Sequence, residues 1–259
     1  MTAALRTQFP GWDGIRLVVF DVDGTLYDQR RLRILMARDI LLDAASRRSL
    51  DVVTVLRTYR RLREEQGERE VAEFDRVLLA ETAKASGYAM EHIGAIIEEW
   101  IGRRPLAYLE RCRYPGLVEL FAGLRHHGKV IGILSDYPAV AKLDALGLCA
   151  DHVVCASDVG LLKPSPRGLE ALIAKAGTTA HQTVLIGDRG DRDGVAARRI
   201  DAWSLIRSAK PLDGWQTFAR FDDAVFHSLL ERPRGMSRRF GGGPRFVGDM
   251  ARGEARREQ

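Results

Sequence analysis

Residues 18–28 read VVFDVDGTLYD. An apolar run stops at Asp21, and a second acid, Asp23, follows two residues later. A strand that is covered on both faces has such an uninterrupted apolar run, as central strands of parallel sheets do. The stretch therefore predicts a buried strand that ends on a pair of carboxylates.

Further apolar runs alternate with helical patterns along the chain. Strands are expected at 16–21, 129–136, 152–157, 183–188 and 202–207. Helices are expected between them at 116–128, 138–147, 165–177 and 192–200, and glycine closes several of them. This alternation predicts an α/β fold, a doubly wound, Rossmann-like parallel sheet with crossover helices.

Residues 29–113 break the alternation, because they contain no convincing strand. Their apolar residues recur at helical spacing instead, as at Leu32, Met36 and Ile40. We therefore expect an inserted all-helical domain over 29–113. The α/β core would then comprise 1–28 and 114–230, followed by a tail at 231–259.

Bulk composition limits the protein class. The chain has 259 residues with 46% hydrophobic content, enough for a sizeable core. No apolar run is long enough to span a bilayer and no leader is evident at the start, so we expect a cytoplasmic protein. The three cysteines show no CxxC spacing, which argues against a disulfide framework or a zinc site.

The net charge of +5 comes mostly from the tail at 231–259, which holds eight arginines and four acids. Its Gly, Pro and Arg content predicts disorder. Such a tail is able to make weak, screened contacts with RNA, an anionic membrane surface or an acidic partner. The alternative is a solvated extension, and nucleic acid is not expected as the main partner.

Polar residues follow the predicted strands at one edge of the sheet. The strand ends carry Asp21, Ser135 with Asp136, and Asp188, and Lys163 follows in the loop DVGLLKPSP. A single aspartate of this kind is more often a cap or turn residue. Several at one edge instead favour a site for Mg²⁺ and a phosphoryl group, since ligands bind at the carboxyl ends of parallel strands.

Four motifs in order, DVDGT, ILSD, KPSP and GDRGDRD, resemble those of the haloacid dehalogenase (HAD) superfamily, and the resemblance spans residues 16–207. It implies a hydrolase of phosphoric monoesters that depends on Mg²⁺ and forms an aspartyl phosphate. The substrate would be a small phosphorylated metabolite. The predicted helical insertion occupies the place where one subclass of this superfamily carries a mobile cap.

The resemblance also implies roles for the acids. Asp21 is similar to the nucleophile and a metal ligand, and Asp188 to a second metal ligand. Asp23 resembles the general acid and base, and its backbone carbonyl would also bind the metal. Asp193 would bind a metal-bound water or orient Lys163.

Phosphate binding would fall to Ser135, Asp136 and Lys163, with Lys163 also acting in catalysis by placing positive charge on the phosphoryl oxygens. Dehalogenases need no acid at the position of Asp23, so its presence favours phosphoryl transfer. Arg189 replaces a small hydroxyl residue that is common in relatives.

The sequence leaves alternatives open for two groups of arginines and for the function of the chain. Arg189 either contacts substrate or pairs with Asp191 or Asp193. The arginines of DQRRLR at 28–33 belong to a solvated helix face or recognise an anionic substrate arm. The chain is a phosphatase, a phosphomutase of the same superfamily, or a non-catalytic binding or regulatory protein that uses its basic tail.

Overall fold

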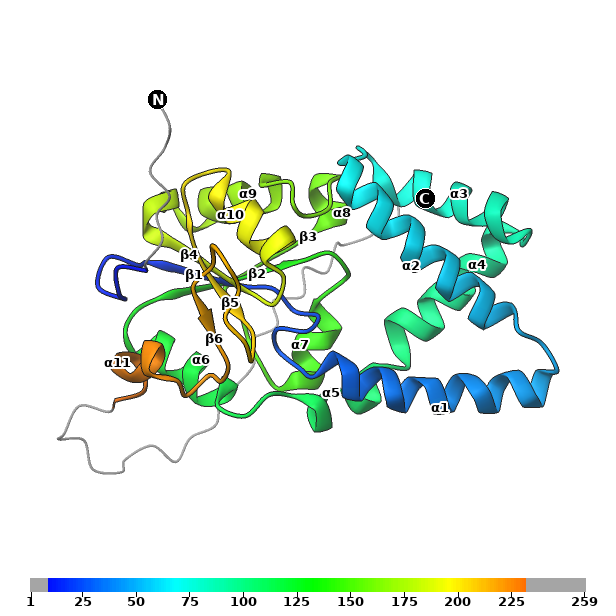
Figure 1. Ribbon diagram of the computed structural model, residues 1–259, viewed down its shortest axis with the longest axis horizontal. Helices are drawn as coiled ribbons and strands as arrows, with labels where there is room; N and C mark the ends of the chain where they lie inside the picture. Colours follow the sequence, from blue (N-terminus) through cyan, green and yellow to red (C-terminus); the bar gives the residue numbers. More distant parts are fainter. Residues whose placement is uncertain (1–8, 232–259) are drawn as a thin grey trace, which may run out of the picture.

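A parallel six-stranded β-sheet forms the centre of the computed structural model, which describes residues 9–231 (Figure 1). The strand order is β3-β2-β1-β4-β5-β6, so the strand that opens the motif lies between two neighbours. The predicted α/β fold with a parallel sheet is confirmed. The strands are β1 (Leu17–Phe20), β2 (Val130–Ser135), β3 (His152–Cys155), β4 (Thr183–Gly187), β5 (Trp203–Arg207) and β6 (Thr217–Phe218).

Side chains of β1 alternate between two apolar layers. Leu17 and Val19 pack in the layer under α9 (Arg167–Ala176) and α10 (Val195–Arg198). Val18 and Phe20 pack in the layer formed with α6 (Leu117–His126), α7 (Val140–Leu146) and α11 (His227–Leu230). Helices thus cover both faces of the sheet (Figure 1), and every residue of β1 is buried. Shorter elements complete this part: α8 (Ala156–Val159), η2 (Ala180–Gln182), η3 (Gly190–Gly194) and η4 (Ala224–Phe226).

Residues 29–112, called the helical segment below, lie to one side of the sheet (Figure 1). The segment begins where the Asp28 carboxylate accepts hydrogen bonds from the backbone N–H groups of Arg30 and Arg31, a typical N-cap. Its helices are α1 (Gln29–Arg47), α2 (Asp51–Arg69), α3 (Phe74–Ser86), α4 (Met90–Ile97), the π-helix η1 (Glu98–Arg103) and α5 (Leu106–Cys112).

The chain leaves and re-enters the sheet at adjacent points. The Asp28 N–H donates to the Cys112 carbonyl at 2.8 Å, and the Tyr114 N–H donates to the Leu26 carbonyl at 3.1 Å. These bonds join the two connections at the places where the sequence predicts the domain boundaries. The division into 1–28 with 114–230, 29–113 and 231–259 itself stays a prediction.

The helical segment also packs on the core away from these connections. Tyr59 and Leu62 of α2 and Phe74 of α3 form a buried cluster with Leu162, from the loop that precedes Lys163. No helix among residues 9–231 is long and apolar enough to cross a membrane. Residues 232–259 of the predicted basic tail at 231–259 lie outside the described residues.

Candidate active site

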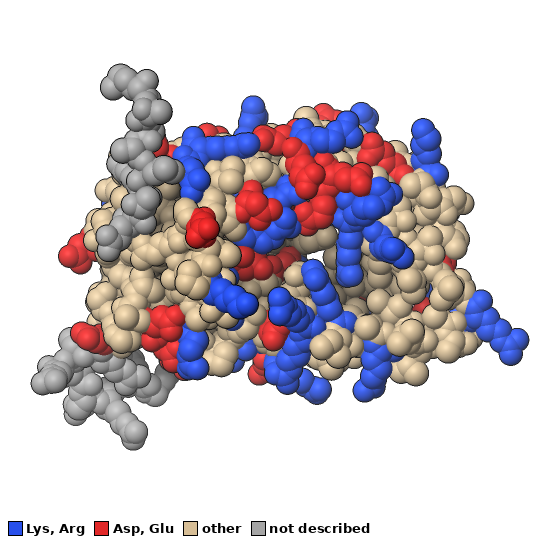
Figure 2. Space-filling view, in the orientation of Figure 1, with Lys and Arg blue, Asp and Glu red and all other residues tan. Residues whose placement is uncertain are grey.

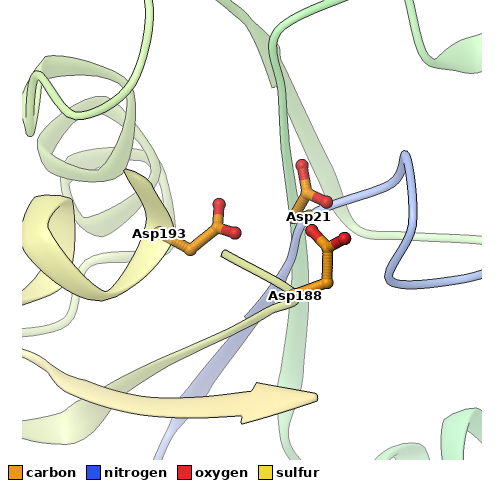
Figure 3. Close-up of side chains that lie close together, drawn as sticks. All are labelled: Asp21, Asp188 and Asp193. Atoms are coloured by element: carbon orange, nitrogen blue, oxygen red, sulfur yellow. The ribbon is translucent and has the colours of Figure 1, made fainter. Parts of the chain in front are cut away.

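Three carboxylates converge at the carboxyl edge of the sheet (Figure 3). Asp21 follows β1, Asp188 follows β4, and Asp193 lies on η3. Each offers an oxygen within 4.8 Å of those of the other two. Parallel strands with neighbouring ends explain the first two positions, and the short η3 turn folds the third back over the edge.

Asp21 is held by two donors. The Lys163 ammonium lies 2.5 Å from its Oδ1, and the Thr25 hydroxyl donates to its Oδ2 at 2.9 Å. Burial raises the pKa of the Asp21 carboxyl well above its usual range, against the effect of Lys163, and the charges of Asp193 and Asp188 raise it further. An added positive charge would therefore be favourable here.

The close approach of the carboxylates also affects the pKa of Asp188 and the residue type allowed at Gly24. Burial, followed by the charge of Asp193, raises the pKa of Asp188 to about 6. Gly24 has a positive φ of 95°, and a Cβ at this position would lie 2.2 Å from the Asp188 carboxylate. Only glycine therefore allows the DVDGT turn to pass so close to the end of β4.

Lys163 joins the acids to the phosphate-binding loop predicted after β2. Its ammonium also donates to Asp193 Oδ1 at 2.7 Å, and its backbone N–H donates to Asp136 Oδ1 at 3.2 Å. Burial lowers the pKa of Lys163, but the charges of Asp193 and Asp21 outweigh this effect and raise it well above its usual value. The contact with Lys163 is the one predicted as an alternative for Asp193.

Ser135 is fully buried at the end of β2. Its Oγ accepts a hydrogen bond from the Tyr137 N–H at 3.2 Å, and the residue does not line the cavity described below. The other predicted site residues, Asp21, Asp23, Asp136, Lys163, Asp188 and Asp193, all line it.

Asp23 stands apart from the acid cluster. The Lys142 ammonium of α7 donates to both of its carboxylate oxygens, at 2.6 and 2.8 Å, and the Tyr27 hydroxyl donates to its Oδ1. Burial alone would raise the pKa of Asp23, but Lys142 and Tyr27 lower it below its usual range. The two aspartates of DVDGT therefore occupy different electrostatic surroundings.

Arg189 pairs within the protein. Its guanidinium lies 2.8 Å from Asp191 and 2.7 Å from Glu64 of α2. Of the two alternatives from sequence, the pairing with Asp191 is therefore present, and the contact with Glu64 was not expected. Arg189 also lines the cavity, as does Arg33 from the stretch 28–33.

Two buried arginines connect the helical segment to the core. Arg63 of α2 stacks on the Tyr137 ring at 4.0 Å and donates to the Asp136 carbonyl. Arg192 of η3 donates to the Lys163 carbonyl at 2.9 Å and to the Glu64 carboxylate at 2.9 Å. Both contacts reach loops that carry predicted site residues.

A cavity of about 620 Å³ lies between the core and the helical segment. Its core side holds the carboxylate cluster with Lys142 and Lys163, and its other side is formed by α1, α2 and η1. In Figure 2 this region is a hollow with acidic side chains inside, basic side chains around much of it and further acidic side chains above it. The volume is in the range of small-molecule sites.

Sequence reasoning missed Lys142 and Arg63 among the residues around the site. A usable signal was present, because each occupies a buried helical stripe of otherwise uncharged residues. These stripes run through Ala139, Lys142, Leu143 and Leu146 on α7 and its N-cap, and through Tyr59, Leu62, Arg63 and Gln66 on α2. A charged residue in such a stripe needs a buried partner.

Comparison with known proteins found a matching family model and a similar curated protein. Residues 15–201 match the family model of haloacid dehalogenase-like hydrolases. A glyceraldehyde 3-phosphate phosphatase of Methanopyrus kandleri is 26% identical over 229 residues, which cover 85% of this chain and 94% of that protein.

Solved structures share the fold at low identity. The HAD-hydrolase YfnB from Bacillus subtilis, crystallised with magnesium, has a TM-score of 0.60 at 18% identity, covering 83% of this chain and 98% of that one. A 2-haloacid dehalogenase from Pseudomonas syringae has a TM-score of 0.56 at 21% identity, covering 77% of this chain and 90% of that one. The chain belongs to the haloacid dehalogenase-like hydrolase family.

Proposed function

We propose that the protein hydrolyses small phosphomonoesters with the help of Mg²⁺, through a phosphoryl group carried by Asp21. The observation that carries this proposal is the separation of the two DVDGT aspartates. Asp21 lies in the carboxylate cluster beside Lys163, whereas Asp23 is held outside it by Lys142. The phosphatase from Methanopyrus kandleri supports the same reaction class.

The donor set suits a hard divalent cation. Asp21, Asp188 and Asp193 offer clustered carboxylate oxygens, and mutual repulsion contributes to the raised pKa values of the first two. The Asp23 carboxylate is engaged elsewhere, so only its backbone carbonyl is proposed as a ligand. When bound, Mg²⁺ would neutralise charge on the carboxylates and on the phosphoryl oxygens.

In the first step, an Asp21 oxygen would attack phosphorus and the bond to the ester oxygen would break. Lys163 would place its positive charge against the phosphoryl oxygens, and Ser135 and Asp136 would shape the binding loop beside it. The leaving oxygen needs a proton from Asp23. The Lys142 ammonium, within hydrogen-bond distance of that carboxylate, would supply the proton through it.

In the second step, Asp23 would accept a proton from a water molecule whose oxygen attacks phosphorus, and would pass this proton back to Lys142, so that both groups regain their starting charges. The bond between Asp21 and phosphorus would break, which releases phosphate and restores the Asp21 carboxylate. Because the proton of the first step came from Lys142, Asp23 is a carboxylate when the second step begins, which is the form that a general base requires. Enclosure by the helical segment would keep bulk water away from the intermediate.

Phosphate release from a panel of phosphorylated metabolites and one aryl phosphate, with and without Mg²⁺, tests the proposal. The wild type is expected to release phosphate only with Mg²⁺, and Asp21→Asn is expected to be inactive. Asp144→Asn, the same substitution at an exposed site on α7, is the matched control. Calorimetry with Mg²⁺ alone should show weaker binding to Asp188→Asn than to the wild type.

Other outcomes would select the alternatives. Isomer formation that outpaces phosphate release from a sugar phosphate would indicate a phosphomutase. Halide release from 2-chloropropionate without phosphate release would indicate a dehalogenase. Equal phosphate release by the wild type and Asp21→Asn would refute the role of Asp21. Inactivity on the whole panel, with salt-sensitive RNA or lipid binding that deletion of 231–259 abolishes, would favour a binding protein.

A further inference from the structure

The two walls that the helical segment gives to the cavity differ in chemistry. The wall from α2 is polar and mostly basic, with Arg60, Arg61, Arg63, Glu64 and Gly67. The facing wall from α1, η1 and the residues that follow is mainly apolar, with Leu32, Met36, Ala37, Ile40, Trp100, Ile101 and Pro105. Arg33, also on α1, lines the cavity as well.

The arginines of these walls differ in whether a carboxylate or carbonyl of the protein pairs with their guanidinium groups. Arg63 is buried and donates to the Asp136 carbonyl, and Arg61 forms an ion pair with Glu65 at 2.7 Å. Arg33 donates to the neutral side chain of Gln29. Among the described residues, no carboxylate forms an ion pair with Arg33 or Arg60. Two guanidinium groups at the cavity thus retain uncompensated positive charge.

Exposure on a solvated helix face does not by itself explain the positions of Arg33 and Arg60. Arg57 on α2 and Arg38 on α1 are exposed and do not line the cavity, as expected for solvated residues. Arg60 and Arg33 are exposed as well, but both line the cavity, one from α2 and the other from α1. Guanidinium groups bind carboxylates and phosphates through paired N–H donors, which makes these two suited to an anion inside the cavity.

The acids lie mainly on the opposite side of the cavity. The core contributes five aspartates, Asp21, Asp23, Asp136, Asp188 and Asp193, and the helical segment contributes Glu64 alone. A phosphate ester at the core would therefore have its far end beside the arginines. A cavity of about 620 Å³ has room for such a far end beyond the phosphoryl group.

We propose that the substrate carries a second anionic group, a carboxylate or phosphate, that binds Arg60 and Arg33. An apolar body would join it to the phosphoryl group and pack on Leu32 and Met36. This inference rests on the proposed function, since it assumes that the phosphoryl group binds at Asp21. It makes the helical segment select partly apolar phosphomonoesters with a second anionic group over esters of the same size whose far end is uncharged.

A matched pair of substrates tests the inference: 4-(2-carboxyethyl)phenyl phosphate and 4-propylphenyl phosphate, which differ in the second anion. The wild type is expected to prefer the carboxylated ester by at least roughly tenfold in kcat/KM, the size expected for a charge-assisted hydrogen bond. Arg60→Gln and Arg33→Gln should each reduce this ratio, and the double variant should abolish it. Arg57→Gln and Arg38→Gln should keep it. Equal rates for both esters in the wild type, or a ratio that survives in the double variant, would overturn the inference.

Failure of the proposed function is separable from failure of this inference. If the wild type hydrolyses neither ester, the hydrolase proposal fails for this substrate class. Calorimetry with the benzylphosphonate analogues of the two esters then decides the inference. Tighter binding of the carboxylated analogue by the wild type, lost in Arg60→Gln with Arg33→Gln, would support it. Equal binding of the two analogues would overturn it.

Discussion

The ammonium nitrogen of Lys142 lies 2.6 and 2.8 Å from the two carboxylate oxygens of Asp23, and only 5% of Lys142 is exposed. The pair joins α7 to the turn that follows β1, two parts of the chain that are 119 residues apart. Because Tyr27 donates to the same carboxylate, the orientation of Asp23 is set from two sides. Lys142 is therefore a positioning residue for the proposed general acid and base.

Lys142→Met should lower kcat for phosphate release by roughly tenfold to hundredfold, because Asp23 loses both its orientation and its proton reservoir. The loss should not exceed the 10²- to 10⁴-fold contribution that acid–base catalysis makes, because Asp23 itself is still present. The KM should change less than kcat, since Lys142 would act through Asp23 and not on the bound ester. Steady-state kinetics with one aryl phosphate measures both constants.

Stability needs a separate control, since removal of one member of a buried ion pair costs about 3 to 5 kcal/mol. Urea unfolding of Lys142→Met, Lys142→Arg and the double variant Lys142→Met with Asp23→Asn provides it. Lys142→Arg should recover part of kcat, and the double variant should recover stability without activity. A Lys142→Met enzyme with wild-type kcat would show that Asp23 needs no positioning from α7.

Glu64 forms ion pairs with both Arg189 and Arg192. Removal of each arginine should have a different effect on the free energy of unfolding. Arg192 is buried and also donates to the Lys163 and Glu64 carbonyls, so Arg192→Met leaves polar groups without partners. We expect a loss of about 2 to 4 kcal/mol in the free energy of unfolding. Arg189 pairs with the same carboxylate from a side chain that is 42% exposed, and Arg189→Gln should cost less than about 1 kcal/mol. Equal losses in urea unfolding would contradict this order.

Asp51 at the start of α2 should make the free energy of unfolding depend on acid pH. Burial alone would raise its pKa, but hydrogen bonds from Ser49, the Val52 N–H and His92 lower it below its usual value of 3.8. A lowered pKa stabilises the fold above the unfolded-state pKa, and this stabilisation is lost as the pH falls through the folded-state pKa.

Asp51→Asn should therefore lower the free energy of unfolding by about 1 kcal/mol at pH 7. The difference from the wild type should persist down to about pH 4 and shrink below it. Urea unfolding at several pH values measures it, with the exposed Asp144→Asn as the control. A difference that is the same at pH 7 and pH 3 would assign the effect to packing and not to charge.

Much of the sheet follows from the sequence. The predicted strands at 16–21 and 183–188 correspond to β1 and β4 within two residues, because central strands have unbroken apolar runs. The two-residue β6 was missed, since so short a strand has no pattern. The predicted helix at 192–200 is instead the π-helix η3 followed by α10. There the turn brings Asp193 over β4, where a Cβ at Gly187 would clash with it.

The convergence of Asp21 and Asp188 was predictable because they follow neighbouring parallel strands, whose ends meet at one edge of the sheet. Lys163 lies in the loop after β3 and α8, and it was predicted at the same edge without its contact with Asp21. The contacts of Lys142 and Arg63 were not predictable, since they depend on how α7 and α2 pack against the ends of the sheet. Helical spacing tells which residues of a helix are buried, but not against what. The cavity walls depend on the same packing, and therefore only the structure shows that Arg33 and Arg60 line one cavity.

Asp21 is proposed to carry the phosphoryl group between the two steps of hydrolysis. The most direct test of this role is rapid acid quenching of the wild-type enzyme during turnover of an aryl phosphate with Mg²⁺, followed by peptide mass spectrometry. One phosphoryl group is expected on the peptide that contains Asp21, located at Asp21, and none in Asp21→Asn. Steady phosphate release with no phosphorylated Asp21 at any quench time would contradict it.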